Sequence, residues 1–268
     1  MATPSERRAG RATPVVEVAG AGPRLVLVHG SLLNARRQWV LQRSLASSFT
    51  LVLPNRTGYP PHPPLDYVDF EPQADDVARL LEEGSHLVGF SYGGIVALLA
   101  AARRPEAIRS LTVIEPPALR VARGHPAVDR LFLDMSTLFW SGPREPRPFV
   151  EEFLQLVGGK MQGTAMQLPQ TLPPDLEQGA RALMVERAPW DARIDLPALA
   201  RAPFPKLVVS GNHLPALDAI CDTLEQELRA ERAVIPGGGH NIPLMGAPFN
   251  DALVGFLERA ERQAAARG

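Results

Sequence analysis

Short runs of β-branched and aliphatic residues alternate along most of the chain with segments whose apolar residues recur every three or four positions. The first pattern is typical of buried strands and the second of helices that cover a sheet. This alternation predicts an α/β fold with a mostly parallel central sheet and helices on both faces. We expect strands at residues 15–18, 25–28, 50–54, 86–90, 110–114, 206–210 and 232–235.

Helical patterns separate these strands. They predict helices at residues 35–47, 73–83, 94–102 and about 250–263. The last of these carries Leu253, Phe256 and Leu257 at spacings of three and four, which place them on one face.

Residues 116–203 break the alternation, because this stretch is rich in proline and shows helical rather than strand periodicity. We predict that residues 1–115 and 204–268 form the core and that 116–203 is a helical cap inserted into it. Ligands of open α/β sheets bind beyond the carboxyl ends of the strands, so the cap is expected to act as a lid over the site. Met135 and Trp140 are candidate walls of its apolar pocket.

Composition narrows the possible partners. The 268 residues are 45% hydrophobic and 21% charged, with a formal net charge of −1, so neither disorder nor nucleic acid binding is indicated. The single cysteine excludes an internal disulfide and is compatible with a reducing compartment. The first residues lack the apolar core of a secretory signal, and no apolar run approaches the ~20 residues of a spanning helix. We expect a soluble cytoplasmic protein with a small-molecule substrate and no membrane partner; the oligomeric state stays open.

The sequence Gly89-Phe90-Ser91-Tyr92-Gly93 joins a predicted strand to a predicted helix. Glycines on both sides of Ser91 permit a tight turn that exposes the serine hydroxyl at the edge of the sheet. A hydroxyl is a weak nucleophile unless a base takes its proton. The alternative interpretation is an ordinary glycine-rich turn, but the strand-turn-helix context favours Ser91 as a nucleophile.

His240 is the best candidate for that base among the six histidines. It follows a predicted strand near the end of the chain and three consecutive glycines, which leave the backbone free to aim the imidazole.

A second turn, His29-Gly30-Ser31-Leu32, follows the strand predicted at 25–28. A tetrahedral oxyanion needs preorganised N–H donors, and the candidates are the N–H of Tyr92 and that of Ser31 or Leu32. His29 is expected to order this turn and to lie beside the substrate. Arg56 is expected to tie the loop after residues 50–54, as surface arginines do.

Together these motifs resemble the α/β-hydrolase fold family: His29-Gly30 after one strand, Arg56 and its loop after the next, the Ser91 turn after a third and Gly239-His240 after the last. The resemblance covers nearly the whole chain. It implies a serine hydrolase of the esterase type, with a cap inserted after the strand at 110–114, the sixth in the family's order, and with neither a metal nor an organic cofactor.

The chain departs from the family pattern at the acid of the catalytic triad. The family usually places this acid three residues after the glycine that ends the strand at 206–210, and here that residue is Leu214. Two replacements stay open: Glu115, directly after the strand at 110–114, which we favour, and Asp218. The role of the triad acid would be to orient His240 and to stabilise the imidazolium that forms on it. His213 is interpreted as a loop histidine, with a bond to the acid as the alternative.

The function expected from these residues is hydrolysis of an uncharged, small or medium-sized ester through an acyl-enzyme on Ser91. A thioesterase, a lactonase or a C–C bond hydrolase would use the same serine and histidine. A different alternative is a ligand-binding homologue without catalysis, and the absence of a carboxylate at Leu214 is the feature that favours it.

Overall fold

A single sheet forms the centre of the molecule. The computed structural model describes residues 14–158, 160–161, 164–165 and 167–266. Its seven-stranded sheet has the order β1-β3-β2-β4-β5-β8-β9; β1 runs antiparallel to β3 and the remaining pairs are parallel. The fold class is therefore as predicted, and each predicted strand is present: β1 (Val15–Ala19), β2 (Arg24–Val28), β3 (Thr50–Asn55), β4 (Ser85–Phe90), β5 (Ile108–Ile114), β8 (Lys206–Ser210) and β9 (Glu231–Val234).

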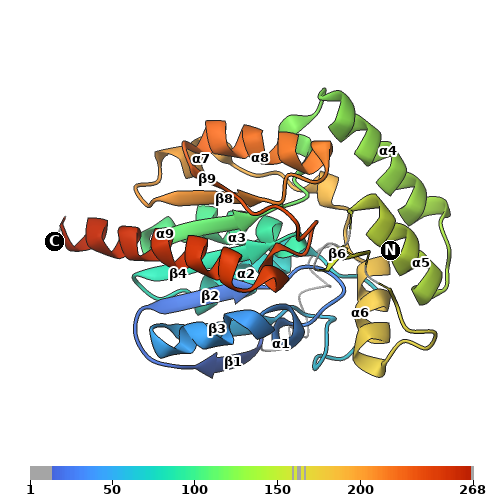
Figure 1. Cartoon of the computed structure of the whole chain (residues 1–268), viewed down its shortest axis with the longest axis horizontal. Helices are drawn as coiled ribbons and strands as arrows, with labels where there is room; N and C mark the ends of the chain where they lie inside the picture. The colour runs from blue at the N-terminus through green and yellow to red at the C-terminus, as the bar shows by residue number, and fades with distance from the viewer. Residues whose placement is uncertain (1–13, 159, 162–163, 166, 267–268) are drawn as a thin grey trace.

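Helices cover both faces of the sheet (Figure 1). The alternation of side chains along β2 shows why, because Leu25 and Leu27 belong to one apolar cluster and Val26 and Val28 to the other. The first cluster lies under α1 (Ala35–Gln38), the 3-10 helix Val40–Ser47 and α9 (Ala247–Ala265); the second lies under α2 (Phe70–Leu80), α3 (Tyr92–Arg103) and α8 (Pro215–Leu228).

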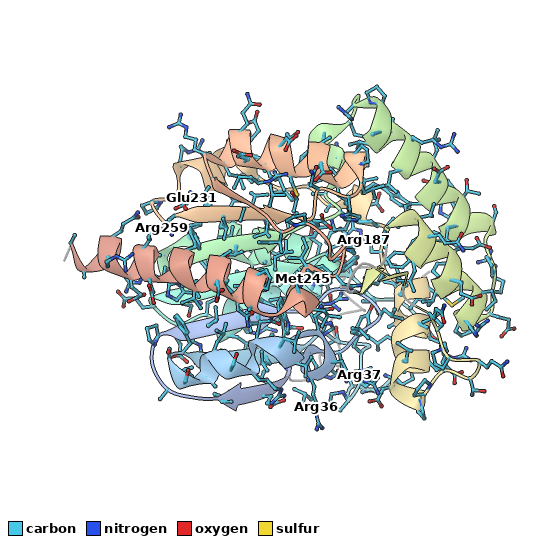
Figure 2. The ribbon with its side chains drawn as sticks, in the orientation of Figure 1. Arg36, Arg37, Arg187, Glu231, Met245 and Arg259 are labelled. Carbon is cyan, nitrogen blue, oxygen red and sulfur yellow. The ribbon has the colours of Figure 1, made fainter. Side chains whose placement is uncertain are left out.

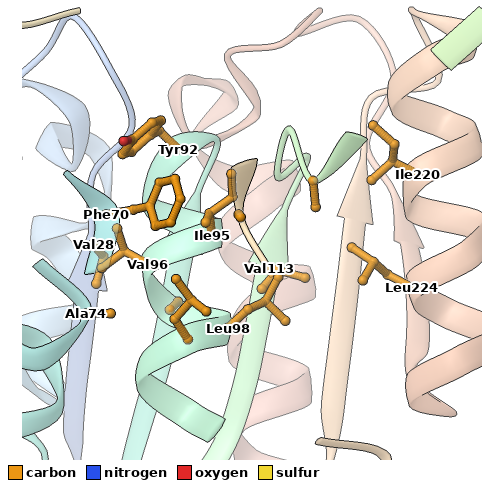
Figure 3. Packing of buried hydrophobic residues seen from close by; sticks show 14 of the residues in the cluster. Val28, Phe70, Ala74, Tyr92, Ile95, Val96, Leu98, Val113, Ile220 and Leu224 are labelled. Atoms are coloured by element: carbon orange, nitrogen blue, oxygen red, sulfur yellow. The ribbon is translucent and has the colours of Figure 1, made fainter. Parts of the chain in front are cut away.

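The second cluster is the larger of the two. Figure 3 shows Ile95 and Leu98 of α3 beside Val113 of β5, and Ile220 and Leu224 of α8 further along the same layer. Burial of these aliphatic side chains stabilises the fold by about 25 cal/mol for each Å² of apolar surface removed from water. It also fixes α3, and with it the turn that precedes α3, against the sheet.

All four predicted helices differ from expectation at their boundaries, α3 by one or two residues at each end. The helix predicted at 35–47 is divided at Trp39, which is fully buried and separates α1 from the 3-10 helix. Helix α2 begins at Phe70 because the side chain of Asp69 accepts a hydrogen bond from the N–H of Glu71 and caps the helix. Helix α9 is longer than predicted. Near its end, Arg259 pairs at 2.5 Å with Glu231 of the edge strand β9 (Figure 2).

The residues between β5 and β8 are mainly helical. Helices α4 (Pro126–Ser141), α5 (Pro146–Leu156) and α6 (Pro174–Met184) lie together beyond one end of the strands, at the right of Figure 1. Helix α7 (Leu196–Arg201) packs instead against α8 and α3. The other elements are short: the hairpin of β6 (Lys160–Met161) and β7 (Thr164–Ala165), and the 3-10 turns Pro105–Ala107, Leu119–Ala122, Pro189–Asp191 and Ile242–Met245. None of the described helices is long and apolar enough to cross a membrane.

Candidate active site

Ser91 occupies the turn between β4 and α3. Its backbone has φ 52° and ψ −126°, a conformation that non-glycine residues rarely adopt. The neighbouring helix start packs closely on the sheet, since a Cβ on Gly93 would lie 2.3 Å from the carbonyl oxygen of His29. The N–H of Ser91 donates to the carbonyl of Ile114 on the adjacent strand at 2.9 Å. These contacts hold Ser91 at the carboxyl edge of the sheet.

His240 lies between Ser91 and Glu115. Its Nε2 is 2.9 Å from Oγ of Ser91, and its Nδ1 is 2.7 Å from Oε2 of Glu115. The ring also contacts that of Phe90, with centroids 5.0 Å apart. All three polar side chains are buried, so their hydrogen bonds are shielded from water.

Glu115 follows β5 directly and is completely buried. Its second oxygen, Oε1, accepts a hydrogen bond from the N–H of Gly211 at 2.7 Å. Burial raises the pKa of Glu115, but hydrogen bonds from His213 and His240 outweigh it and lower the pKa to about 2. The carboxylate is therefore ionised at neutral pH and acts only as an acceptor.

The structure does not bring Asp218 to His240. Asp218 lies in the first turn of α8, and burial together with the charge of Glu115 raises its pKa. Leu214, where the family pattern expects the acid, is the N-cap residue of the same helix. Of the two carboxylates expected from the sequence, Glu115 is the one in contact with His240.

The turn that follows β2 lies beside Ser91. A Cβ on Gly30 would be 3.0 Å from Cβ of Ser91, and Leu32 has φ 72°. Within the described part of the chain, the backbone N–H groups of Ser31, Leu32 and Tyr92 donate to no protein acceptor. Unpaired N–H groups of this kind are free to bind an oxygen of a ligand.

A buried carboxylate that the sequence analysis missed supports this turn. Glu186 accepts hydrogen bonds from Ser31 Oγ at 2.5 Å, from Arg56 Nη2 at 2.7 Å and from Tyr59 Oη at 2.8 Å. Arg56 also donates to the carbonyl of Gly30 at 2.8 Å. Glu186 thus connects the segment between β5 and β8 to the turn beside Ser91.

Arg56 is not a surface residue, contrary to the prediction. It is only 3% exposed, and its guanidinium lies 4.5 Å from the ring centroid of Tyr59 and 4.7 Å from that of Tyr92. Burial lowers the pKa of Arg56, but Glu186, Tyr59 and Tyr92 together outweigh it and raise the pKa. The buried ion pair explains why the arginine is tolerated in the core.

His29 orders the turn, as expected, but it does not line the pocket. Its Nε2 accepts the backbone N–H of Arg56 at 2.9 Å, so the proton is on Nδ1, which faces the carbonyl of Gly30 at 2.8 Å. Burial and the charge of Arg56 place the pKa of His29 well below its usual range. A neutral, completely buried histidine with both ring nitrogens engaged has no free group for substrate, which corrects the expected contact.

An apolar pocket opens beside Ser91 and His240. Its lining includes Leu119, Leu131, Met135, Phe139, Phe153 and Leu217. Met135 is one of these lining residues. Trp140 is not: it is 69% exposed on the outer face of α4, where it follows the exposed Leu133 by seven residues, about two helical turns.

Glu115, His213 and His240 bring potential metal-ligating atoms within 4.8 Å of one another. Their hydrogen bonds favour another interpretation. Oε1 of Glu115 already accepts an N–H from Gly211, and Nδ1 of His240 donates to Oε2. These contacts define a hydrogen-bonded cluster centred on the carboxylate, and we assign no metal ion to it.

A serine on the turn after a central strand, a histidine on the loop after the last strand and a parallel sheet between them define an α/β-hydrolase. A sequence model described as the alpha/beta hydrolase family matches residues 25–252. The chain therefore belongs to the alpha/beta hydrolase family, as its motifs indicated.

Two curated relatives carry the name pimeloyl-[acyl-carrier protein] methyl ester esterase. The chain is 34% identical to the one from Aeromonas hydrophila subsp. hydrophila over 110 residues, which are 40% of this chain and 43% of the relative. It is 32% identical to the one from Chromobacterium violaceum over 99 residues, 37% of this chain and 39% of the relative. These matches span less than half of either protein.

Solved structures show the same fold at low sequence identity. A thermophilic esterase from Thermogutta terrifontis aligns with a TM-score of 0.63 and 20% identity, covering 92% of this chain and 93% of that one. An esterase from Rhodococcus sp. ECU1013 aligns with a TM-score of 0.66 and 19% identity, covering 91% and 94%. At this identity the likeness extends to the fold alone.

Proposed function

We propose that this chain is a serine hydrolase that cleaves an uncharged ester of small or medium size, with Ser91 as nucleophile, His240 as base and Glu115 as the acid of the triad. One observation carries the proposal: Ser91, His240 and Glu115 form a continuous buried relay with distances of 2.9 Å and 2.7 Å. A serine with a base in hydrogen-bond reach, and a third group orienting that base, is the arrangement that activates a hydroxyl for attack.

In the first half of the reaction, Oγ of Ser91 attacks the ester carbonyl carbon while Nε2 of His240 takes the hydroxyl proton. Glu115 holds the proton of Nδ1, so Nε2 carries the lone pair, and its charge stabilises the imidazolium that forms. The imidazolium then gives its proton to the departing alcohol. This leaves an acyl group on Ser91.

In the second half, a water molecule gives a proton to His240 and attacks the acyl carbonyl. Collapse of the second tetrahedral intermediate returns the proton to Ser91 and releases the acid. His240 thus takes up and returns one proton in each half, and the chain is unchanged at the end of the cycle.

The N–H groups of Tyr92 and of Leu32 or Ser31 are the proposed oxyanion donors. The proximity of Gly30 to Ser91 and the lack of protein acceptors for these N–H groups within the described residues support this assignment. Donors fixed in advance by the backbone need no reorganisation when charge develops on the carbonyl oxygen. Removal of one such donor typically costs a factor of about 10²–10³ in rate.

The pocket supports an apolar substrate group. We propose that residues 116–203 act as a cap domain, since α4 and α5 supply Leu131, Met135, Phe139 and Phe153 to the pocket wall. The methyl ester esterases named above make esters of a small alcohol the first compounds to assay. Thioesters, lactones and diketones are the comparison substrates, because the same serine and histidine can act on them.

The relay also bears on the alternative of a binding protein without catalysis. That alternative rested on the lack of a carboxylate at Leu214. Glu115 places a carboxylate 2.7 Å from His240, and this contact supports the catalytic proposal over the binding protein.

The test is labelling with a fluorophosphonate, which reacts with activated serines, followed by intact and peptide mass spectrometry. We expect one adduct on Ser91 in the wild type, none in Ser91→Ala and strongly reduced labelling in His240→Ala. Ser47→Ala removes an exposed serine and is the matched control, which should label normally. If the folded wild-type protein gives no adduct on Ser91, the proposed mechanism is wrong.

A further inference from the structure

His213 lies between the proposed triad acid and the end of α5. Its Nδ1 is 3.2 Å from Oε1 of Glu115, an ion-pair distance, and its Nε2 is 3.1 Å from the carbonyl oxygen of Val157. Val157 is the C-cap residue of α5. The side chain of His213 is 9% exposed, so both contacts are largely shielded from solvent.

Both groups that face the ring of His213 are acceptors. A carbonyl oxygen carries no proton. The Glu115 carboxylate is ionised, because burial raises its pKa but the two histidines outweigh this and lower the pKa to about 2. A neutral imidazole has a single N–H and would direct the lone pair of its other nitrogen at an oxygen. The imidazolium instead donates from Nε2 to the carbonyl of Val157 and places its positive charge beside the carboxylate, where Nδ1 lies at an ion-pair distance of 3.2 Å from Oε1 without hydrogen-bond geometry.

The surrounding charges favour the same state. Burial lowers the pKa of His213, but Glu115, the carbonyl of Val157 and Asp218 of α8 together raise it above its ordinary value. His240 faces it from the loop after β9, with ring centroids 6.3 Å apart. The charge of Arg232 of β9 acts on Asp218 and opposes the rise in the pKa of that carboxyl.

The same short segment holds both histidines. The carbonyl of Gly158 accepts the backbone N–H of His240 at 3.3 Å, one residue after the carbonyl that contacts His213. A side chain at position 158 would collide with the ring, since a Cβ there would lie 2.7 Å from Cδ2 of His213. The end of α5 is thus fitted closely to His213, and α5 itself presents Phe153 to the pocket.

We propose that His213 is a positioning residue that, as an imidazolium, joins Glu115 to the end of α5 and so fixes both the orientation of the carboxylate and the pocket wall beside Ser91. Loss of its proton at alkaline pH removes the positive charge that attracts the carboxylate and loosens this connection. The inference rests on the proposed function, because it concerns the activity of the same site.

The first measurement is a pH titration of the wild-type protein, with ¹³C- and ¹⁵N-labelled histidine followed by NMR. The His213 signals are identified by their absence in His213→Gln. We expect this histidine to hold its proton to a higher pH than an ordinary histidine, with both ring nitrogens protonated at neutral pH, and its titration to coincide with an alkaline decline in kcat/KM. A neutral His213 at pH 6 would overturn the proposal.

The second measurement is kinetic. His213→Gln keeps one donor but does not titrate, so we expect kcat to fall by about 10-fold to 100-fold, the loss expected for a hydrogen bond to a charged group, with a higher KM and no alkaline decline centred on the His213 titration. His125→Gln alters an exposed histidine and should behave as wild type. Wild-type kcat, KM and alkaline decline in His213→Gln would refute the positioning role.

The two proposals fail in different ways. If wild-type protein gives no fluorophosphonate adduct on Ser91, the hydrolase mechanism fails and the inference fails with it. If Ser91 is labelled in both the wild type and His213→Gln, but the variant has the kinetic constants and pH profile of the wild type, only the role of His213 is wrong.

Discussion

Oε2 of Glu115 lies 2.7 Å from Nδ1 of His240, although 125 positions separate the two residues in the chain. The register of the sheet explains how Glu115 reaches the site. Phe90 of β4 pairs with Ile114 of β5, so Ser91 and Glu115 are the residues that directly follow two paired positions on adjacent parallel strands. The strand next to the proposed nucleophile therefore places a carboxylate against His240, and the proposed triad does not depend on an acid at position 214.

Replacement of this carboxylate tests its assignment. Glu115→Gln keeps the shape of the side chain but removes the charge that supports the imidazolium, and its amide can favour the wrong tautomer of His240. We expect kcat for an ester substrate to fall by about 10³–10⁴, the loss seen when a triad carboxylate becomes an amide. Steady-state assays near neutral pH measure it.

Asp218→Asn is the matched control for that variant. It makes the same chemical change at the other carboxylate that the sequence left open, and we expect kcat near neutral pH to stay within about threefold of wild type, since Asp218 acts on Glu115 and His213 only through its charge and does not contact His240. A large loss in Asp218→Asn with an active Glu115→Gln would exchange the roles of the two residues.

The buried pair of Glu186 and Arg56 predicts a stability effect. Glu186→Ala leaves the Arg56 guanidinium without its partner, and both side chains are almost inaccessible to solvent, at 2% and 1% exposed. Breaking a buried ion pair from one side typically lowers the free energy of unfolding by about 3–5 kcal/mol. Urea denaturation of the variant, followed by circular dichroism, measures the change.

Glu177→Ala provides the comparison, because Glu177 pairs with Arg181 on the exposed face of α6 at 2.8 Å, with side chains 44% and 58% exposed. Pairs of this kind contribute about 0–1 kcal/mol. Glu186→Ala should also lose activity beyond its effect on stability, since Ser31 loses the acceptor that fixes the turn beside Ser91. Equal stability of the two variants would mean that the ion pair is not important to the fold.

The low pKa of Glu115 predicts how stability depends on pH. The pKa of Glu115 is about 2 in the folded protein and 4.5 in the unfolded chain. The ionised carboxylate therefore stabilises the fold fully above pH 4.5, and this stabilisation is lost as the pH falls toward 2. Denaturant titrations across this range should show wild type losing about 3 kcal/mol more of its unfolding free energy than Glu115→Gln does. Parallel curves for the two proteins would contradict the lowered pKa.

The strands and the relay could be predicted because their signals are local. A run of β-branched residues predicts a buried strand. Ser91 and Glu115 follow such a run directly and His240 follows one after a short glycine-rich loop, so each was expected at the carboxyl edge of the sheet. The role of Glu186 could not be predicted in this way. Its partners Ser31 and Arg56 lie 155 and 130 positions away, and nothing near residue 186 indicates that the carboxylate is buried.

The error at Trp140 has a different cause. Residues Leu131, Met135 and Leu138 of α4 are buried, whereas Leu133 and Trp140 are exposed, so the helix has two apolar faces in sequence and only one of them meets the core. Periodicity shows which residues share a face, but it does not show which face the rest of the molecule covers. That choice depends on how α4 packs against α5 and α8.

The same contrast on α4 predicts substrate preference. Met135 is 4% exposed and lines the pocket beside Ser91, so Met135→Ala should enlarge the pocket and improve kcat/KM for longer acyl esters relative to short ones. Each additional methylene that becomes buried is worth about 0.8 kcal/mol, which corresponds to about fourfold. A series of p-nitrophenyl esters with increasing acyl length, assayed well below the melting temperature of the variant, gives the profile of kcat/KM against acyl length.

Trp140→Ala is the control for this profile. It removes a larger side chain from the outer face of the same helix and should leave the profile unchanged. A shift in Trp140→Ala without one in Met135→Ala would mean that substrate binds on the outside of α4 rather than in the pocket beside Ser91.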